Sequence, residues 1–181
     1  MAVPTFLVGR RKPGAGRMIG TGGTAVVFIL SLVIVAGFGY GRPGFQFTET
    51  GEWASTFGLN YTVGVDGISL PLLLIATLLC LLAALGSRDM ISQREAEYYS
   101  LFLVFETGII GVFTSLNLIL FYVFWEVVLI PMFFFIGVWG GPRRKYASLK
   151  FLIFTYAGSA IMLFASRPWV DLASCRAPLR A

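Results

Sequence analysis

Three stretches of this chain are long, apolar and almost free of charge, and they limit its fold more than any other feature. They run from Met18 to Gly41, from Gly67 to Ser87 and from Tyr98 to Pro142, and only Glu106 and Glu126 interrupt the last one. The hydrocarbon core of a bilayer is about 30 Å thick, and about 20 helical residues cross it. Each stretch is long enough to span a membrane. A composition of 57% hydrophobic and 13% charged residues also indicates a membrane protein.

The third stretch is too long for one crossing. It has 43 residues from Tyr98 to Gly140, which would make a single helix about twice as long as the hydrocarbon core is thick. Short polar side chains at 114–117 compete for backbone hydrogen bonds and favour a turn there. We therefore predict an all-α, polytopic integral membrane protein of about five transmembrane helices. Their expected ranges are 20–39, 69–87, 98–114, 118–139 and 147–165.

Several positions are expected to shape these helices. Ser69 is the expected N-cap of the second helix, Asp66 is expected to cap or to shape the loop before it, and the polar stretch around Glu49 to Trp53 is expected to be an external loop. Pro131 predicts a kink in the fourth helix, because proline removes a helical hydrogen bond. Gly108 and Gly111, and residues 157–160, are expected at close helix contacts.

Basic residues divide the predicted loops into two sets. One side carries nine of them and the other carries only Arg42. The positive-inside rule then predicts a multi-pass protein of the cell membrane with a cytoplasmic N-terminus. This explains the net charge of +5 better than nucleic-acid binding does. The nine residues are Arg10, Arg11, Lys12, Arg17, Arg88, Arg94, Arg143, Arg144 and Lys145.

The chain accordingly divides into three parts. We expect a basic cytoplasmic segment at 1–19, a transmembrane helical domain at 20–166 and an atypical tail at 167–181. The tail carries arginines where the charge rule disfavours them, and it has no hydrophobic periodicity. We interpret it as a truncated or out-of-frame end, with a native short tail as the alternative.

Two acids interrupt the apolar hairpin at similar depth. Glu106 and Glu126 each lie ten residues from Leu116, so in a tight antiparallel hairpin both sit about 15 Å from the turn, near the bilayer midplane. A charge is costly there, which makes an intramembrane acid a functional hypothesis by default. Glu126 is the main candidate for proton exchange, against a purely structural hydrogen bond between helices. Glu106 and Lys150 are further candidates; Glu106 could instead pair with a polar neighbour, and Lys150 could reach back to the basic loop.

The sequence offers no conventional metal or disulfide site. It contains no histidine, and its two cysteines are Cys80 in an apolar segment and Cys175 in the tail. The usual metal ligands and the usual cysteine pairs are therefore missing. Any proton chemistry has to use Glu, Asp, Lys or Tyr side chains.

Three segments resemble a known family. They are YTVGVDGISLPLLLIATLLCLLAALGS, GVFTSLNLILFYVFWEVVLIPMFFFIGVWGG and KYASLKFLIFTYAGSAIMLFA. They are similar to successive segments of the antiporter-like chain 4 (subunit M) family of proton-pumping NADH:quinone oxidoreductase, respiratory complex I. The resemblance covers about residues 57–165 and is most specific at FWE…LIPM…WGG. It implies a partial antiporter-like fold and a membrane-arm subunit that takes part in proton translocation coupled to quinone reduction. Glu126, the glutamate of the WE motif, would be a key proton-translocating residue.

The resemblance also has limits. Glu106 occurs in only some family members, and Lys150 aligns with a common lysine that is not the pump lysine. The family's pump lysines lie beyond the matching segments, so this polypeptide alone is expected not to pump. No cofactor is expected on it: flavin, iron–sulfur clusters and quinone would belong to partner subunits of the membrane complex, and its partners would be those subunits and the lipid bilayer, not nucleic acid.

Some alternatives stay open. The electron donor could be NADH or a deazaflavin. The chain could also be a subunit of a multisubunit sodium/proton antiporter, which shares the fold and the intramembrane acid. The remaining possibility is a structural membrane helix bundle in which the acids only form hydrogen bonds between helices.

Overall fold

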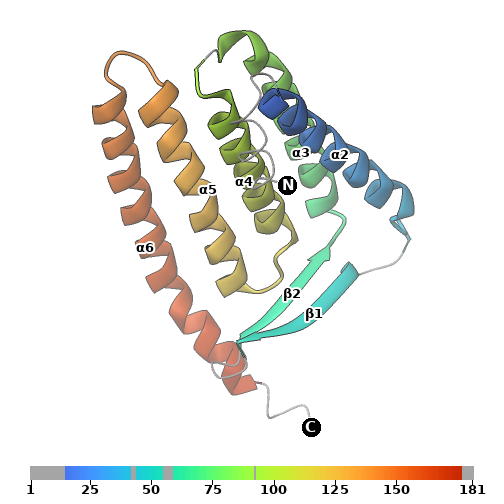
Figure 1. Ribbon diagram of the computed structural model, residues 1–181. Helices are drawn as coiled ribbons and strands as arrows, with labels where there is room; N and C mark the ends of the chain where they lie inside the picture. Colours follow the sequence, from blue (N-terminus) through green and yellow to red (C-terminus); the bar gives the residue numbers. More distant parts are fainter. Residues whose placement is uncertain (1–14, 42–43, 55–58, 92, 177–181) are drawn as a thin grey trace.

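Five long helices and one β-hairpin make up the computed structural model, which describes residues 15–41, 44–54, 59–91 and 93–176 (Figure 1). Each of the five helices is long and apolar enough to cross a membrane. The predicted helical, polytopic membrane fold is confirmed. In chain order the elements are α2 (Ala15–Gly37), β1 (Gln46–Ala54), β2 (Leu59–Val65), α3 (Ser69–Met90), α4 (Glu95–Thr114), α5 (Leu118–Trp139) and α6 (Arg144–Arg176).

The helix ends differ from the predicted ones mainly at the two ends of the chain. Helix α5 spans the residues expected for it, and Pro131 lies buried inside it. Helix α2 begins at Ala15 instead of residue 20, and α6 continues to Arg176 instead of ending at residue 165. Most of the predicted tail at 167–181 is therefore helical. The remainder of that tail, 177–181, and residues 1–14 of the predicted basic segment lie outside the described residues.

A two-stranded antiparallel hairpin stands where an external loop was predicted. Glu49 pairs with Val63 and Thr50 with Thr62 across β1 and β2. The segments QFTETGEWA and LNYTVGV contain aromatic and β-branched residues, which favour extended backbone. The backbone N–H of Leu116 donates to the carbonyl of Thr62 at 3.0 Å. This bond ties the hairpin to the α4–α5 turn, at the end of the molecule away from the α3–α4 and α5–α6 connections (Figure 1).

The start of α3 corrects the prediction that Ser69 is the N-cap. The Asp66 carboxylate accepts from the backbone N–H groups of Ser69 at 2.6 Å and Ile68 at 3.2 Å. In return, the hydroxyl of Ser69 accepts from the backbone N–H of Asp66 at 2.9 Å. Asp66 therefore satisfies the free N–H groups of the first turn, and Ser69 holds the other half of a capping box.

Glycines allow the helices to approach one another closely. A Cβ added at Gly20 or Gly23 of α2 would strike the side chains of Tyr99 or Leu103 on α4. On the other side of α4, a Cβ at Gly108 would lie 2.7 Å from Val128 Cγ2 of α5. Small residues allow close approach of membrane helices. Helix α4 is thus packed tightly between α2 and α5. The close contacts predicted at Gly108 and Gly111 are confirmed.

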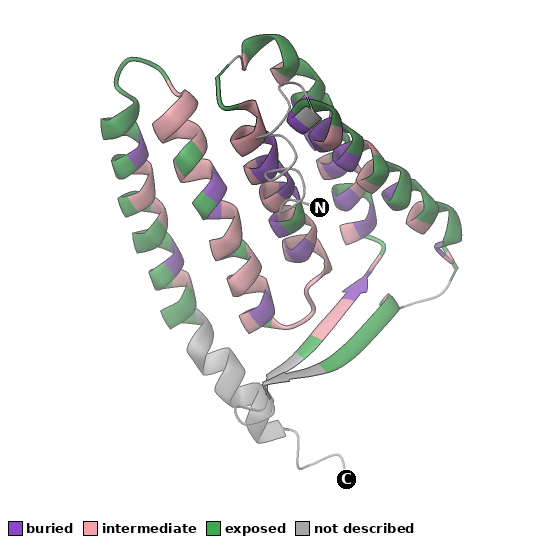
Figure 2. Ribbon diagram, viewed as in Figure 1, coloured by how far each residue is buried: buried purple, intermediate pink, exposed green. Residues whose placement is uncertain are grey.

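Helix α6 packs less closely. Along its described side chains, most apolar residues are exposed (Figure 2). Of residues 157–160, which were predicted to make close contacts, Ser159 is buried and the other three are exposed. That prediction was wrong for Gly158, since nothing lies within 4 Å of a Cβ built there.

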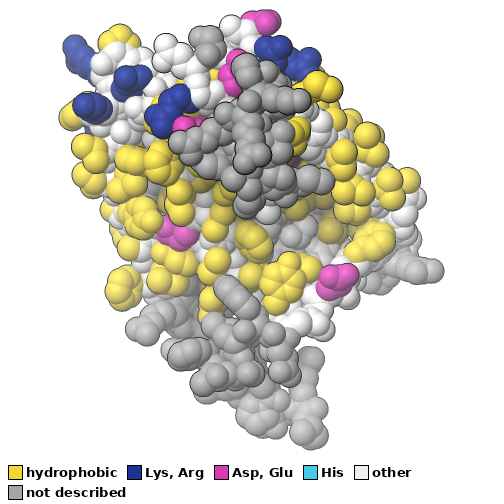
Figure 3. All heavy atoms as spheres, viewed as in Figure 1, with side chains coloured by type: hydrophobic (Ala, Val, Ile, Leu, Met, Phe, Trp, Pro, Cys, Tyr) yellow, Lys and Arg dark blue, Asp and Glu magenta, His cyan; other side chains and the backbone are white. Residues whose placement is uncertain are grey.

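The basic residues gather at one end of the helices. Lys and Arg side chains gather at the end where α2 and α4 begin and α5 gives way to α6, whereas the sides of the molecule are mainly hydrophobic (Figure 3). Many large apolar side chains on these sides are exposed. An apolar belt beneath a basic end is the surface expected of a membrane protein.

Candidate functional site

Glu126 lies in the middle of α5 and faces α6. It is the ninth residue of the 22-residue helix, so it lies about 12 Å from the helix start. The Ser159 hydroxyl of α6 donates to Glu126 Oε1 at 2.8 Å, and Ser159 itself is buried. A hydrogen bond to an ionised carboxylate is stronger than one between neutral groups. The acid is therefore hydrogen-bonded to the neighbouring helix near the middle of the apolar α5 segment.

Two tyrosines accompany this pair. Tyr122 precedes Glu126 by one helical turn, and its side chain interacts with both Glu126 and Ser159. Tyr156 contributes its backbone carbonyl, which accepts from the Ser159 hydroxyl at 3.2 Å. We call Glu126, Ser159, Tyr122 and Tyr156 the α5–α6 polar cluster. It brings together exchangeable protons from two helices inside an apolar span.

The sequence reasoning missed three members of this cluster. The spacing of Tyr122 and Glu126 is i, i+4, which places both on one face of a helix, and this signal could have found the tyrosine. No comparable signal identifies Ser159 or Tyr156, because their position opposite Glu126 depends on how α6 is rotated against α5. Ser159 was expected to be a close-packing residue only.

Glu106 has the predicted depth but faces the other way. It precedes Gly108, which faces α5, by two residues, a rotation of about 200° around the helix. It follows Leu103, which packs on Gly23 of α2, by three residues and so shares its face. The prediction of a turn between α4 and α5 was correct. The two acids, however, lie on opposite sides of this pair of helices.

The surroundings of Glu106 contain no hydrogen-bond partner among the described residues. Its side chain is 2% exposed, and neither Oε1 nor Oε2 has a partner there. The adjacent Thr107 hydroxyl donates instead to the carbonyl of Leu103 at 2.7 Å. The alternative that Glu106 pairs with a polar neighbour is therefore wrong for the described part of the chain.

Lys150 lies apart from both acids. Its side chain is exposed, and its ammonium group lies 5.9 Å from the ring centre of Tyr146 and 5.8 Å from that of Phe154. It precedes Ser159 by nine residues, or about 13 Å along α6. The structure therefore gives Lys150 aromatic neighbours on its own helix and no contact with Glu126.

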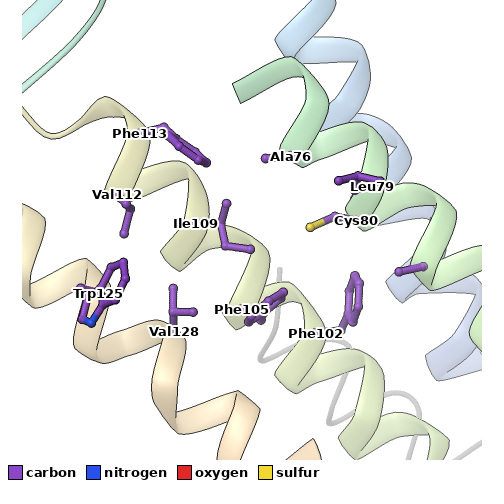
Figure 4. Close-up of a pocket in the computed structure, with 11 residues that line it drawn as sticks. Ala76, Leu79, Cys80, Phe102, Phe105, Ile109, Val112, Phe113, Trp125 and Val128 are labelled. Carbon is purple, nitrogen blue, oxygen red and sulfur yellow. The ribbon is translucent and has the colours of Figure 1, made fainter. Parts of the chain in front are cut away.

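The cavity drawn in Figure 4 has a different character. It measures about 480 Å³ and lies between α3 and α4, with Trp125 and Val128 of α5 on one side. Phe102, Phe105 and Leu79 are typical of its apolar lining. A proton path needs polar or hydrated groups, so this cavity is suited to hydrocarbon and not to proton transfer.

Two family models match the chain. The model described as NADH-ubiquinone oxidoreductase chain 4, amino terminus, matches residues 24–123. The model described as NADH:quinone oxidoreductase/Mrp antiporter, transmembrane, matches residues 115–171 and so contains the whole α5–α6 polar cluster.

Individual proteins are similar over most of this chain. NADH-quinone oxidoreductase subunit M of Rhodobacter capsulatus is 46% identical over 142 residues, which are 78% of this chain and 27% of that protein. F(420)H(2) dehydrogenase subunit M of Methanosarcina mazei is 35% identical over 162 residues, 90% of this chain and 32% of that protein. A chain of respiratory complex I from Thermus thermophilus with bound NADH superposes with a TM-score of 0.71 at 31% identity, covering 82% of this chain and 30% of that one. The chain thus spans about a third or less of the length of these relatives.

Proposed function

Because the chain belongs to the NADH-ubiquinone oxidoreductase chain 4 family, whose model matches more than half of its residues, we propose that it serves in the membrane arm of a proton-translocating NADH:quinone oxidoreductase. It is a multi-pass membrane protein. We further propose that it lies in the plasma membrane with its basic end and N-terminus on the cytoplasmic side, as the positive-inside rule predicts.

The observation that carries this proposal is the hydrogen bond between Ser159 and Glu126 at mid-membrane depth. An ionised carboxylate is costly at this depth, so an acid that is kept there is by default a candidate functional group. The bond joins two helices, so movement of α6 relative to α5 would change the stability of the ionised carboxylate. Coupling between helix movement and proton affinity is what a proton-translocating subunit requires.

The chain's own residues suggest how one proton is handled. In the ionised form, Glu126 accepts a hydrogen bond from Ser159, and Tyr122 supplies a second polar group one turn away. When the carboxyl takes up a proton it becomes neutral, and its hydroxyl becomes a donor to a neighbouring oxygen. Pro131 leaves the carbonyl of Val127 without its usual helical donor, beside the acid. That carbonyl provides an acceptor for a water molecule or for the acid's proton.

The redox groups would lie elsewhere in the complex. No group of three His, Cys, Asp or Glu side chains that could hold a metal occurs in the described part of the chain. From the family to which the chain belongs, we propose that flavin, iron–sulfur clusters and the quinone site belong to partner subunits, and that this chain contacts other membrane-arm subunits. The electron donor, NADH or a deazaflavin such as F420H2, is a property of those partners.

The test is Glu126→Gln, introduced into the chromosomal gene so that the protein is studied in its own complex. Glutamine keeps the size and the hydrogen bonding but cannot exchange a proton. We expect NADH-driven proton uptake into inside-out vesicles to fall at least tenfold, since a positioned acid–base group contributes about 100-fold or more. Glu49→Gln, on the exposed β1 strand, is the matched control and should pump normally. Pumping by Glu126→Gln within twofold of wild type would favour the purely structural helix bundle.

A sodium/proton antiporter subunit is the second candidate, because the description of the model over residues 115–171 includes Mrp antiporters. The same vesicles distinguish the two. An antiporter subunit would change the internal pH when sodium is added without any electron donor, and Glu126→Gln would abolish that response. A subunit of the oxidoreductase requires NADH or a related donor and would respond to inhibition of electron transfer.

A further inference from the structure

Glu106 is the buried acid that the proposed mechanism does not use. Its carboxyl oxygens have no partner among the described residues, and the side chain is 2% exposed. An unpaired buried carboxylate is strongly destabilising, so such a group is either neutral or hydrated. The question is which of its neighbours could bring a proton or a water molecule to it.

The neighbours on α3 follow from the helix register. The Tyr99 hydroxyl of α4 donates to the carbonyl of Ala84 on antiparallel α3 at 3.3 Å. Seven residues further along each helix, about 10.5 Å, Glu106 and Thr77 reach the same level on the facing sides. Cys80, one turn from Thr77, interacts electrostatically with Glu106. Thr77 is buried and shares a hydrogen bond of 3.0 Å with Ser31 of α2. Hydroxyl groups therefore meet near the acid on two helices.

The neighbours on α2 extend from Glu106 to the basic end. Gly23 packs on Leu103, so the next residue, Thr24, lies within about one helical turn of the level of Glu106. Thr24 is 0% exposed, and its hydroxyl donates to the carbonyl of Thr21 at 3.0 Å. Thr21 in turn accepts from the Arg88 guanidinium at 3.1 Å. Arg88 is exposed at the basic end, where water is available.

These residues form a polar line, which we define as Arg88, Thr21, Thr24 and Glu106. Both threonine hydroxyls donate to carbonyls of their own helix. One lone pair of Thr21 Oγ1 accepts from Arg88, which leaves its second lone pair and the oxygen of Thr24 to accept hydrogen bonds from water. The line is separate from the α5–α6 polar cluster, because the close contact of Gly108 and Gly111 with Val128 and Phe124 lies between them.

We propose that Glu106 is a second proton-exchanging group, which is reached by water from the basic end of the protein along this polar line. A proton from water at the basic end converts the carboxylate to the neutral acid, and the return of that proton to water restores the carboxylate. The inference rests on the proposed function of the chain in proton translocation, and it adds a site and a route that do not involve Glu126.

Infrared spectroscopy of the complex in its own membranes tests the site. We expect Glu106→Gln to remove a carboxylic acid C=O band that shifts in D₂O, and Glu126→Gln to leave that band in place. Glu106→Asp should move the band without removing it, because aspartate keeps a carboxyl group at this site. The inference is wrong if Glu106→Gln removes no acid band, or if the band that it removes does not shift in D₂O.

Cysteine labelling tests the route. In a chain in which Cys80 and Cys175 are replaced by Ala, Thr24→Cys should react with a charged, membrane-impermeant thiol reagent added on the side of the basic end. Ala84→Cys is the matched control, because Ala84 is equally buried but does not belong to the polar line. Labelling at position 84 but not at 24, or equal labelling of Thr24→Cys from both sides, would overturn the route.

The two proposals can fail separately. If Glu126→Gln pumps normally, the proposed function fails whatever the infrared result. If Glu126→Gln stops pumping while Glu106 contributes no exchangeable acid band, the proposed function stands and this inference is overturned.

Discussion

At the scale of single residues, three acids of this chain show how position decides what a carboxylate does. Asp66 lies at a helix start and accepts hydrogen bonds from backbone N–H groups. Glu126 accepts a hydrogen bond from a hydroxyl of the neighbouring helix. Glu106 has no hydrogen-bond partner among the described residues. The sequence alone could predict that all three are unusual, since each interrupts or borders an apolar span. It could not predict their partners, because two of the three environments depend on side chains from other helices.

Asp66 gives a prediction about pH. Hydrogen bonds to its carboxylate hold the pKa of Asp66 below its usual value. The largest contribution comes from the backbone N–H of Ser69, followed by the Ser69 hydroxyl and the N–H of Ile68. Because the folded-state pKa is the lower one, the ionised cap stabilises the folded chain above about pH 4, and this contribution is lost as the pH falls through the folded-state pKa. Asp66→Ala should lower the free energy of unfolding in detergent by about 1 kcal/mol near neutral pH.

Asp66→Asn is the control for this prediction, because asparagine keeps an N-cap acceptor but does not titrate. The stability difference between wild type and Asp66→Asn should shrink between about pH 6 and about pH 3. A difference that stays constant over that range would show that the charge of Asp66 does not contribute.

At the scale of helices and strands, the predictable features were those that a single segment encodes. The turn after Thr114 follows from short polar residues, and Asn117 caps α5 by accepting from the N–H of Ile119 at 2.9 Å. The β1–β2 hairpin was missed because strand pairing is a contact between segments. The hydrogen bond between Thr62 and Leu116 also joins this hairpin to a turn that is distant in the sequence. The rotation of α6, which brings Ser159 to Glu126, was missed for the same reason.

The contact between α4 and α5 gives a prediction about packing. A Cβ at Gly111 would collide with the Phe124 ring, so Gly111→Ala forces either this side chain or one of the two helices to shift. Overpacking of this kind costs about 1–3 kcal/mol. Gly86→Ala in α3 is the matched control, because nothing lies within 4 Å of its added Cβ and alanine is the better helix former.

Thermal unfolding in detergent measures both variants. Gly111→Ala should unfold at a lower temperature than wild type, and Gly86→Ala should be as stable or more stable. If Gly111→Ala matched Gly86→Ala, the close α4–α5 contact would not be important for stability.

At the scale of the whole molecule, charge and hydrophobicity are distributed by depth. Lys and Arg side chains gather at one end, and the β-hairpin lies at the other (Figures 1 and 3). The sequence could predict this distribution, because it requires only the order of the spans and the charges of the loops between them. Apart from the α4–α5 hairpin, which the turn at 114–117 predicts, it could not predict which helices lie side by side. The apolar faces of the spans look alike, and packing is decided by glycines and hydroxyls on specific faces.

This distribution predicts the topology in the membrane. In a chain without its native cysteines, Lys145→Cys should react with an impermeant maleimide in inside-out vesicles, and Glu49→Cys should react in right-side-out vesicles. Both positions are exposed. Lys145 is the second residue of α6 and Glu49 belongs to β1, and the start of α6 and the β-hairpin lie at opposite ends of the molecule (Figure 1). Labelling of both positions in the same vesicle orientation would contradict a membrane-spanning arrangement of these helices.

The most direct test of proton exchange at the α5–α6 polar cluster is to move the carboxyl group across the helix contact. Ser159 Oγ lies 2.8 Å from Glu126 Oε1, so the double variant Glu126→Ser with Ser159→Glu places an acid at nearly the same point from the opposite helix. Donor-driven proton uptake into inside-out vesicles is then compared among wild type, Glu126→Ser and the double variant. We predict that Glu126→Ser loses most of the uptake and that the double variant recovers it several-fold. Uptake by Glu126→Ser at the wild-type rate would contradict a role for this carboxyl in moving protons.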